Sequence, residues 1–206
     1  MIFKNKILNF LLLAILLNSN YTNSIAFSVN DHRIAVLVND ELITSYDIVQ
    51  RMKMNAILTG VEITPENNNQ FINSVVDELI KEKLKNEKLG EYDISVSEDE
   101  FAGQEKAFYN NKPFTKDVII ETFKLNNIEY SEFKKYLIDE ISWQKLILEM
   151  YFRLTSTSEI EIEEIFIKNP NITKDRAREI IVQRQLDLKS NKMIRDMFNE
   201  ATIEYK

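Results

Sequence analysis

"RIAVLVNDELITSYDIVQRM", residues 33–52, decides the fold, because it places two strand-like segments directly before the start of a helix. Residues 34–38 form an apolar run that is too short for a helix and too apolar for a loop, so we expect a strand. The run breaks at residues 39–41 and resumes at residues 42–43. This pattern predicts a two-stranded hairpin at the front of the chain.

The rest of the chain is expected to be mainly helical. It holds 3 Gly and 3 Pro against 44% hydrophobic and 29% charged residues, which favours long helices with few loops. Thr44 precedes Asp47 with the spacing of a capping box, so a first helix is expected there, ending at Gly60. Caps and apolar residues spaced three and four apart predict further helices from Thr64-Pro65 to Gly90 and over residues 98–109, 116–125, 131–154 and 176–200, with a turn or two at 162–167.

Two helices carry more apolar residues than one face can hold. Residues 131–154 bear two adjacent stripes, so we expect other helices to surround this one. The stripes are Phe133, Leu137, Ile141, Leu148 and Phe152, and beside them Tyr136, Trp143, Ile147, Met150 and Leu154. Residues 176–200 also have two apolar sides, so one side is expected to dock and the other to face a ligand, unless both are buried.

The two ends of the chain are expected to meet. Residues 201–206 (ATIEYK) alternate like a strand. A two-stranded hairpin alone is marginal in water, so residues 34–38 need a third strand. We therefore expect residues 34–38 to pair with residues 202–205.

Residues 1–26 have the pattern of a cleaved secretory signal: Lys4 and Lys6, an apolar run over residues 7–17, and small residues at 24–26. The alternative is a membrane anchor, but the apolar run has little more than half of the roughly 20 residues that a spanning helix needs. No Cys occurs, so neither a disulfide nor a lipid anchor on Cys is expected.

The charge balance argues against two classes of partner. The net charge is −7, and residues 1–26 contribute two Lys and no acidic residue, so residues 27–206 carry −9. Nucleic acids and anionic membrane surfaces attract basic proteins, so we expect neither as a partner. The composition is that of an acidic, exported helical protein.

The side chains needed for catalysis are scarce. His32 is the single histidine and Cys is absent, so Cys-His and two-histidine mechanisms are excluded. The acidic cluster at Glu159, Glu161, Glu163 and Glu164 lacks the alternating ligands and central Gly of a calcium loop. The three Gly are isolated and form no phosphate loop. We expect no catalytic residue, no metal and no cofactor.

Four segments in order carry a resemblance to a known family: IAVLVNDELITSYDI, VVDELIKEKLKNEKLG, ISVSEDEF and LNNIEYSEFKKYLIDEISWQKLI. Together they resemble the N-terminal domain of the SurA family of periplasmic chaperones and prolyl isomerases. Residues 177–206 resemble that family's C-terminal helix and strand. The resemblance implies a mainly helical module in which the last helix docks on the N-terminal domain and the last strand joins the first hairpin.

The chain departs from the family where the parvulin isomerase domains stand. Such a domain needs on the order of a hundred residues, but only residues 155–175 occupy its place, and the family's active-site histidines are missing. We therefore expect a signal peptide at 1–26, an N-terminal chaperone domain at 27–154, a joint at 155–175, and a docking helix and strand at 176–206. We expect no isomerase activity.

The resemblance predicts an ATP-independent periplasmic holdase for unfolded outer-membrane proteins and aromatic-rich peptides. The alternatives are a prolyl isomerase with an atypical site and an adaptor for one fixed partner. Aromatic residues are dense on the short helices between 101 and 130, and we expect them to bind clients; the alternative, that they cover the core, stays open. These residues are Phe101, Phe108, Tyr109, Phe114, Phe123 and Tyr130.

Overall fold

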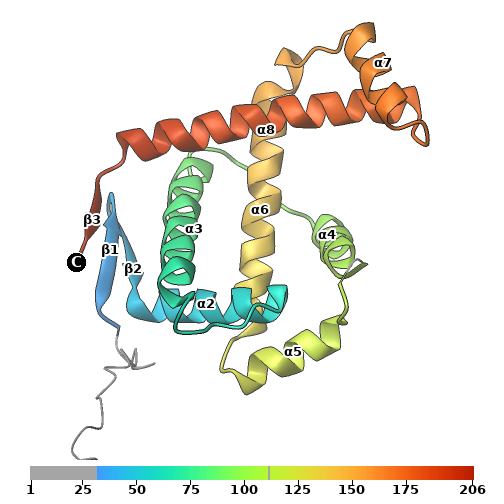
Figure 1. Cartoon of the computed structure of the whole chain (residues 1–206). Coiled ribbons are helices and arrows are strands. Elements are labelled where there is room, and N and C mark those ends of the chain that lie inside the picture. The colour runs from blue at the N-terminus through green and yellow to red at the C-terminus, as the bar shows by residue number, and fades with distance from the viewer. Residues whose placement is uncertain (1–31, 111) are drawn as a thin grey trace, which may run out of the picture.

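The computed structural model describes residues 32–110 and 112–206, so the expected signal peptide at 1–26 lies outside the described residues. The elements are β1 (Ile34–Val38), β2 (Glu41–Thr44), α2 (Ser45–Thr59), α3 (Asn68–Leu89), α4 (Glu98–Asn110), α5 (Lys116–Leu125), α6 (Tyr130–Tyr151), the 3-10 helix η1 (Phe152–Leu154), α7 (Glu159–Lys168), α8 (Lys174–Glu200) and β3 (Ile203–Tyr205). The mainly helical fold with one small sheet is confirmed (Figure 1).

The sheet joins the two ends of the described chain, as the alternation of residues 201–206 predicted. Its strand order is β2-β1-β3, and both pairings are antiparallel. Val36 lies opposite Tyr205, and Val38 lies opposite Ile203. Asn39, whose φ is +51°, closes the β1–β2 turn; its N–H donates to the Thr202 carbonyl (2.8 Å), and its side-chain oxygen accepts from the Thr202 N–H (2.9 Å).

Local capping signals set the ends of α2 as expected. The Thr44 hydroxyl accepts from the Asp47 N–H, and the Asp47 carboxylate accepts from the Thr44 N–H (2.8 Å), which completes the capping box. Gly60 ends the helix with a φ of +70°, in the left-handed region that Gly adopts at little cost.

The expected start of the next helix at Thr64-Pro65 is wrong. The Thr64 carbonyl accepts hydrogen bonds from both the Asn67 and Asn68 N–H groups, and the Asn67 side chain accepts from the Thr64 N–H. These bonds make residues 64–67 a separate turn, and α3 begins at Asn68. A side chain that bonds the local backbone competes with helix propagation, which the cap signal alone did not predict.

Helix α3 lies at the centre of the fold, against α2 and the sheet on one side and α6 and α8 on the other (Figure 1). Two apolar clusters flank it. The first lies under the sheet and consists of Val36, Val38, Ile43, Ile48, Met52, Val75, Leu79, Ile80 and Leu84. The second lies where α8 crosses α6 and consists of Trp143, Leu146, Ile147 and Leu186. The expected core position of Trp143 is confirmed, and its indole N–H donates to Ser190 Oγ on α8 (2.9 Å).

A buried charge cluster also joins α2 to α3. The Arg51 guanidinium donates to Glu78 (2.8 Å) and to Glu82 (2.6 Å), and it lies 5.2 Å from the centre of the Tyr136 ring. Burial lowers the pKa of Arg51, but the two carboxylates more than offset this and raise it, so the side chain stays charged. Burial together with nearby Glu140 raises the pKa of Tyr136 to about 12, so its hydroxyl stays neutral.

Only the C-terminal part of α8 packs on the body of the molecule. Figure 1 shows α8 crossing the end of α6 and continuing outward, with α7 folded against its free end. There Ile162 on α7 packs on Ala177 and Ile181 of α8. We call α7 together with residues 174–181 the arm.

The expectation that other helices surround residues 131–154 is wrong for the end of that segment. Leu148, Phe152 and Leu154 are exposed, whereas Phe133, Leu137 and Ile141, which precede the crossing, are buried. The reason is geometric, because α8 crosses α6 instead of running along it and covers only the residues at the crossing.

Candidate functional site

The structure brings most of the predicted aromatic residues into one cluster. Phe108 and Tyr109 come from α4, Phe114 from the following link, Phe123 from α5 and Tyr130 from the first turn of α6. Four of these rings surround Phe133, with centroid distances of 5.0 Å for Phe108, 6.4 Å for Tyr109, 6.1 Å for Phe123 and 5.6 Å for Tyr130. We call these five predicted residues together with Phe133 the aromatic cluster. Tyr109 in turn lies 6.3 Å from Phe114.

Local signals place these helices. Ser97 and Glu100 form the expected capping box at the start of α4, and the Thr115 hydroxyl caps α5. Asn127, with a φ of +55°, turns the chain from α5 toward α6, in a backbone conformation that Asn tolerates better than most residues.

A polar group ties the three helices of the cluster together. Glu105 on α4 accepts hydrogen bonds from the Tyr130 hydroxyl (2.6 Å) and from Lys116 Nζ on α5 (2.7 Å), and the hydroxyls of Tyr109 and Tyr130 lie 3.2 Å apart. Burial raises the pKa of both tyrosines, and the bond to Glu105 raises that of Tyr130 further. Burial also acts to raise the pKa of Glu105, but the bonds from Lys116 and Tyr130 outweigh it, so the pKa falls.

These pKa directions describe a structural arrangement, because the carboxylate stays ionised and the phenols stay neutral around pH 7. A general acid or base needs a pKa near the working pH, which none of these groups has. The hydrogen bonds around Glu105 therefore hold α4, α5 and α6 together. The apolar rings of the aromatic cluster remain as the surface that can contact a ligand.

Exposure differs among the predicted residues. Phe123 is fully buried, whereas Phe108, Tyr109, Phe114 and Tyr130 are half-buried. Phe101 is also half-buried and lies slightly apart, with Lys134 Nζ 4.9 Å from its ring centre. The ring of Phe123 would reach a ligand only if α5 moved.

Sequence reasoning missed the exposed apolar side chains of α5. These are Val118, Ile120 and Leu125, which lie outside the buried face formed by Ile119 and Phe123. The signal was present, because the five apolar residues of this ten-residue helix cannot all fit one face.

Sequence reasoning also missed a concave surface between α6 and α8, next to the arm. A hollow of about 570 Å³ is lined by Leu148, Ile180, Val182 and Leu186, with Arg176, Glu179, Gln183, Arg184 and Asp187 around it. A second hollow of about 290 Å³ shares Leu148 and reaches Ile94 and Lys145. We call the two hollows together the arm cleft. The sequence signal for this cleft was the second apolar side expected for residues 176–200, which form most of α8.

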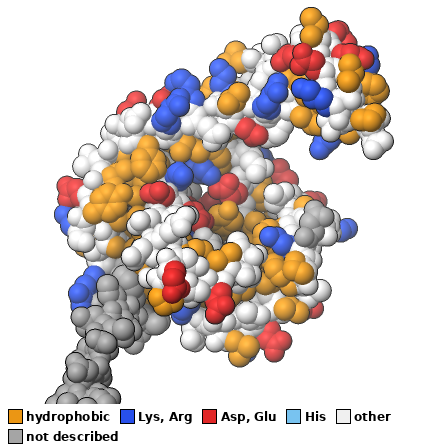
Figure 2. All heavy atoms as spheres, in the orientation of Figure 1, with side chains coloured by type: hydrophobic (Ala, Val, Ile, Leu, Met, Phe, Trp, Pro, Cys, Tyr) orange, Lys and Arg blue, Asp and Glu red, His pale blue; other side chains and the backbone are white. Residues whose placement is uncertain are grey.

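The arm cleft has the composition of a binding surface, an apolar centre with a charged rim. Leu148 and Ile180 are exposed there, and Figure 2 shows further apolar side chains gathered on the arm where it projects from the body. Ile160 and Ile167 of α7 are among the exposed residues. Single exposed apolar residues are normal, but a gathered set indicates an interaction site.

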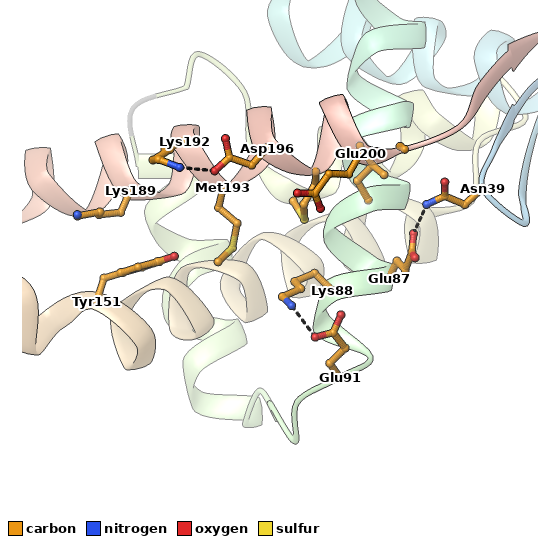
Figure 3. Close-up of a pocket in the computed structure, with 13 residues that line it drawn as sticks. Asn39, Glu87, Lys88, Glu91, Tyr151, Lys189, Lys192, Met193, Asp196 and Glu200 are labelled. Atoms are coloured by element: carbon orange, nitrogen blue, oxygen red, sulfur yellow. Dashed lines mark hydrogen bonds and ion pairs between the residues drawn. The ribbon is translucent and has the colours of Figure 1, made fainter.

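A third hollow, of about 610 Å³, lies between the end of α3, the end of α6 and α8 (Figure 3). Its charges are largely paired: Lys88 with Glu91 (2.5 Å) and Lys192 with Asp196. The hydrogen bond that Lys88 donates to Glu91 raises the pKa of Lys88. Such internal pairing leaves little free charge for a ligand, so this hollow gives no sign of catalysis.

Other catalytic or metal-binding arrangements are not found in the described part of the chain. His32 is exposed, with its ring 4.8 Å from that of Tyr46. No three His, Cys, Asp or Glu residues among those described are placed to hold a metal ion. Among the described helices, none combines the length and apolar character required to cross a membrane.

Comparisons with known proteins give one family. The model of the SurA-like N-terminal domain matches residues 4–147. Among solved structures, the chain is similar to one determined in a study of the virulence factor PEB4 and the periplasmic protein Cj1289, two structurally related SurA-like chaperones of Campylobacter jejuni. The two chains are 24% identical, and the TM-score is 0.35. The match covers 67% of this chain and 50% of the other, so this chain spans about half of that relative's length. No curated protein matches.

Proposed function

Since the chain belongs to the family with a SurA-like N-terminal domain, we propose that it is an ATP-independent chaperone that holds unfolded outer-membrane proteins in the periplasm. The family supports a chaperone role. The proposal that the clients are unfolded outer-membrane proteins is supported by the arm cleft.

The arm cleft is the observation that carries the proposal. Leu148, Ile180 and the partly buried Val182 offer apolar contacts, and charged side chains frame them. Strands of outer-membrane proteins alternate apolar and polar residues, so an unfolded segment can place apolar side chains in the cleft and polar ones at its rim. Many such weak contacts give affinities around micromolar, about −8 kcal/mol, which lets clients leave without ATP.

The predicted aromatic residues form a second proposed contact surface. Phe101, Phe108, Tyr109, Phe114 and Tyr130 keep part of their surface exposed, and exposed Val118 and Leu125 of α5 lie on the neighbouring helix. The short helices α4 and α5 can shift more easily than α6, because fewer elements pack on them.

We propose the domain division expected from the sequence: a signal peptide at 1–26, a chaperone domain at 27–154, a joint at 155–175 and a docking segment at 176–206. The joint contains α7, which covers Ala177 and Ile181 of α8. Within the proposal this joint replaces the parvulin domain, and its helix α7 forms part of the arm.

Aggregation suppression tests the proposal. An outer-membrane porin unfolded in urea is diluted into buffer with and without the protein, and light scattering is followed. We expect scattering to fall as the protein concentration rises, without ATP, and for several unrelated porins. No suppression would refute the proposal.

Two parallel measurements separate the alternatives. Suppression of a single porin among many would favour an adaptor for one fixed partner. Turnover of a proline peptide above the uncatalysed rate would favour an isomerase with an atypical site.

A further inference from the structure

Two methionines of α8, Met193 and Met197, lie one helical turn apart on the same face of the helix and line the hollow of Figure 3. We call this hollow, between the ends of α3 and α6 and the C-terminal half of α8, the α8 hollow. Both side chains are half-buried. Figure 3 shows the Met193 side chain extending from α8 into the hollow. Each thioether therefore packs on the protein and remains within reach of a small molecule from solvent.

The packed side of these methionines holds α8 on the body of the molecule. Met193 packs against the apolar cluster at the crossing of α6 and α8. Met197 packs against the same cluster and also against the cluster under the sheet. The helix ends at Glu200, and β3 begins at Ile203. A chemical change at Met197 therefore acts on the docking of α8 and on the attachment of β3 together.

The open side of the methionines is polar. Lys88, Lys189 and Lys192 line the α8 hollow. Lys88 bonds Glu91 and Lys192 bonds Asp196, but an ammonium group has three donors, so each lysine keeps donors for a further acceptor. A thioether is a weak acceptor and favours the apolar clusters, whereas the oxygen of a sulfoxide is polar and favours these lysines.

The other methionines of the described chain have different surroundings. Met52 and Met54 are buried, at 7% and 3% exposure. Met150 is half-buried on α6 and does not line the α8 hollow. The chain has no Cys, so reversible oxidation of sulfur can occur only at methionine.

We propose that Met193 and Met197 form an oxidation site at which hydrogen peroxide converts the two thioethers to sulfoxides and loosens the C-terminal half of α8. At each residue the sulfur lone pair attacks one peroxide oxygen, and an S–O bond forms as the O–O bond breaks. A proton moves to the departing oxygen, which leaves as water. The sulfur is oxidised by two electrons, and the peroxide is reduced by two.

The product no longer suits the packing of α8. Burying a polar group in an apolar cluster costs free energy unless the group finds a hydrogen-bond partner there. The sulfoxide oxygens find their donors among the lysines of the α8 hollow, on the opposite side from the clusters. Oxidation therefore draws both side chains out of the contacts that dock α8 and hold β3 near the sheet.

The test treats the folded full chain with hydrogen peroxide and follows each methionine by peptide mass spectrometry. We expect Met193 and Met197 to gain one oxygen each before Met52 and Met54 do. The urea midpoint, followed by Trp143 fluorescence, should fall by roughly 1 M. Methionine sulfoxide reductases for both sulfoxide epimers should restore the midpoint.

Variants locate the effect. Met193→Leu with Met197→Leu removes both sulfur atoms and nearly conserves side-chain volume, so the double variant should fold and keep its urea midpoint after peroxide treatment. The matched control is Met150→Leu, which removes a half-buried sulfur outside the α8 hollow. It should stay as sensitive to peroxide as the wild type. Met193→Gln with Met197→Gln should lower the midpoint without peroxide, because the amides are polar like the sulfoxides.

Three results would overturn the oxidation site. The first is oxidation of Met52 and Met54 as fast as that of Met193 and Met197. The second is an oxidised wild type with an unchanged urea midpoint. The third is an equal fall of the midpoint in the wild type and the double Leu variant, which would place the effect at another residue. None of these measurements involves a client, so they test the oxidation site independently of the proposed function.

Discussion

Leu186 and Leu188 on α8 provide a matched test of how this helix docks. Leu186 is 5% exposed and packs with Trp143, Leu146 and Ile147, whereas Leu188 is 64% exposed. Truncating a buried Leu removes its contacts and leaves a cavity, which costs about 3 kcal/mol within a usual range of 2–5. The same truncation at an exposed site usually changes the free energy of unfolding by less than about 0.5 kcal/mol. We therefore expect Leu186→Ala to be strongly destabilising and Leu188→Ala to be nearly neutral.

The assay is urea unfolding followed by tryptophan fluorescence. Trp143 is the single tryptophan of the chain, is buried, and bonds to Ser190 on α8, so it reports directly on the α6–α8 contact. With a slope of about 2 kcal/mol per molar urea, Leu186→Ala should lower the midpoint by roughly 1.5 M. Equal midpoints for the two variants would refute the reasoning, because the helix would then not be docked through Leu186.

Three further predictions follow from other parts of the chain. Deleting residues 202–206 removes β3 and its bonds to Asn39, so we expect a lower melting temperature and faster proteolysis at β1; unchanged stability would show that the pairing contributes nothing. Replacing Tyr109, Phe114 and Tyr130 together by Ala should weaken aggregation suppression with less loss of stability than the 3–5 kcal/mol typical of each fully buried ring; a variant that unfolds, or one with full activity, removes this surface from the proposal. The hydrogen bonds from Lys145 and Ser97 lower the pKa of Glu100 from 4.5 to about 2, so its contribution to stability is present above pH 4.5 and is lost as the pH falls toward 2. Glu100→Gln should therefore weaken the pH dependence of the melting temperature between pH 4.5 and 2. An unchanged pH profile would contradict the assignment.

Features that depend on neighbouring residues or on an unpaired strand could be predicted from the sequence. The Thr44–Asp47 box and the stop at Gly60 involve groups a few residues apart, so their spacing is visible in the chain. The pairing of β1 with β3 followed from the instability of a lone hairpin. The start of α3 was predicted wrongly although its signal is also local, because the Asn67 side chain bonds Thr64 three residues earlier and favours a separate turn.

The site depends on long-range packing, and here prediction was weaker. The density of aromatic residues between 101 and 130 indicated a cluster, but nothing in the chain showed that Phe133 would be its centre. The exposure of Leu148 depends on where α8 crosses α6, and the apolar pattern of α6 is the same with or without that crossing.

The central claim is that exposed apolar side chains of the arm cleft hold unfolded clients. Leu148→Ser with Ile180→Ser changes two cleft residues that are 48% and 37% exposed, and Leu42→Ser with Val61→Ser is a matched control at 46% and 44% exposure outside the cleft. Both double variants should keep the wild-type urea midpoint within about 0.5 M, because surface changes cost little.

The decisive measurement is the concentration of each double variant that halves the aggregation of an unfolded porin. The account predicts at least a fivefold higher concentration for the cleft variant, roughly 1 kcal/mol of lost binding, and no change for the control. Equal suppression by the cleft variant and the wild type would contradict it.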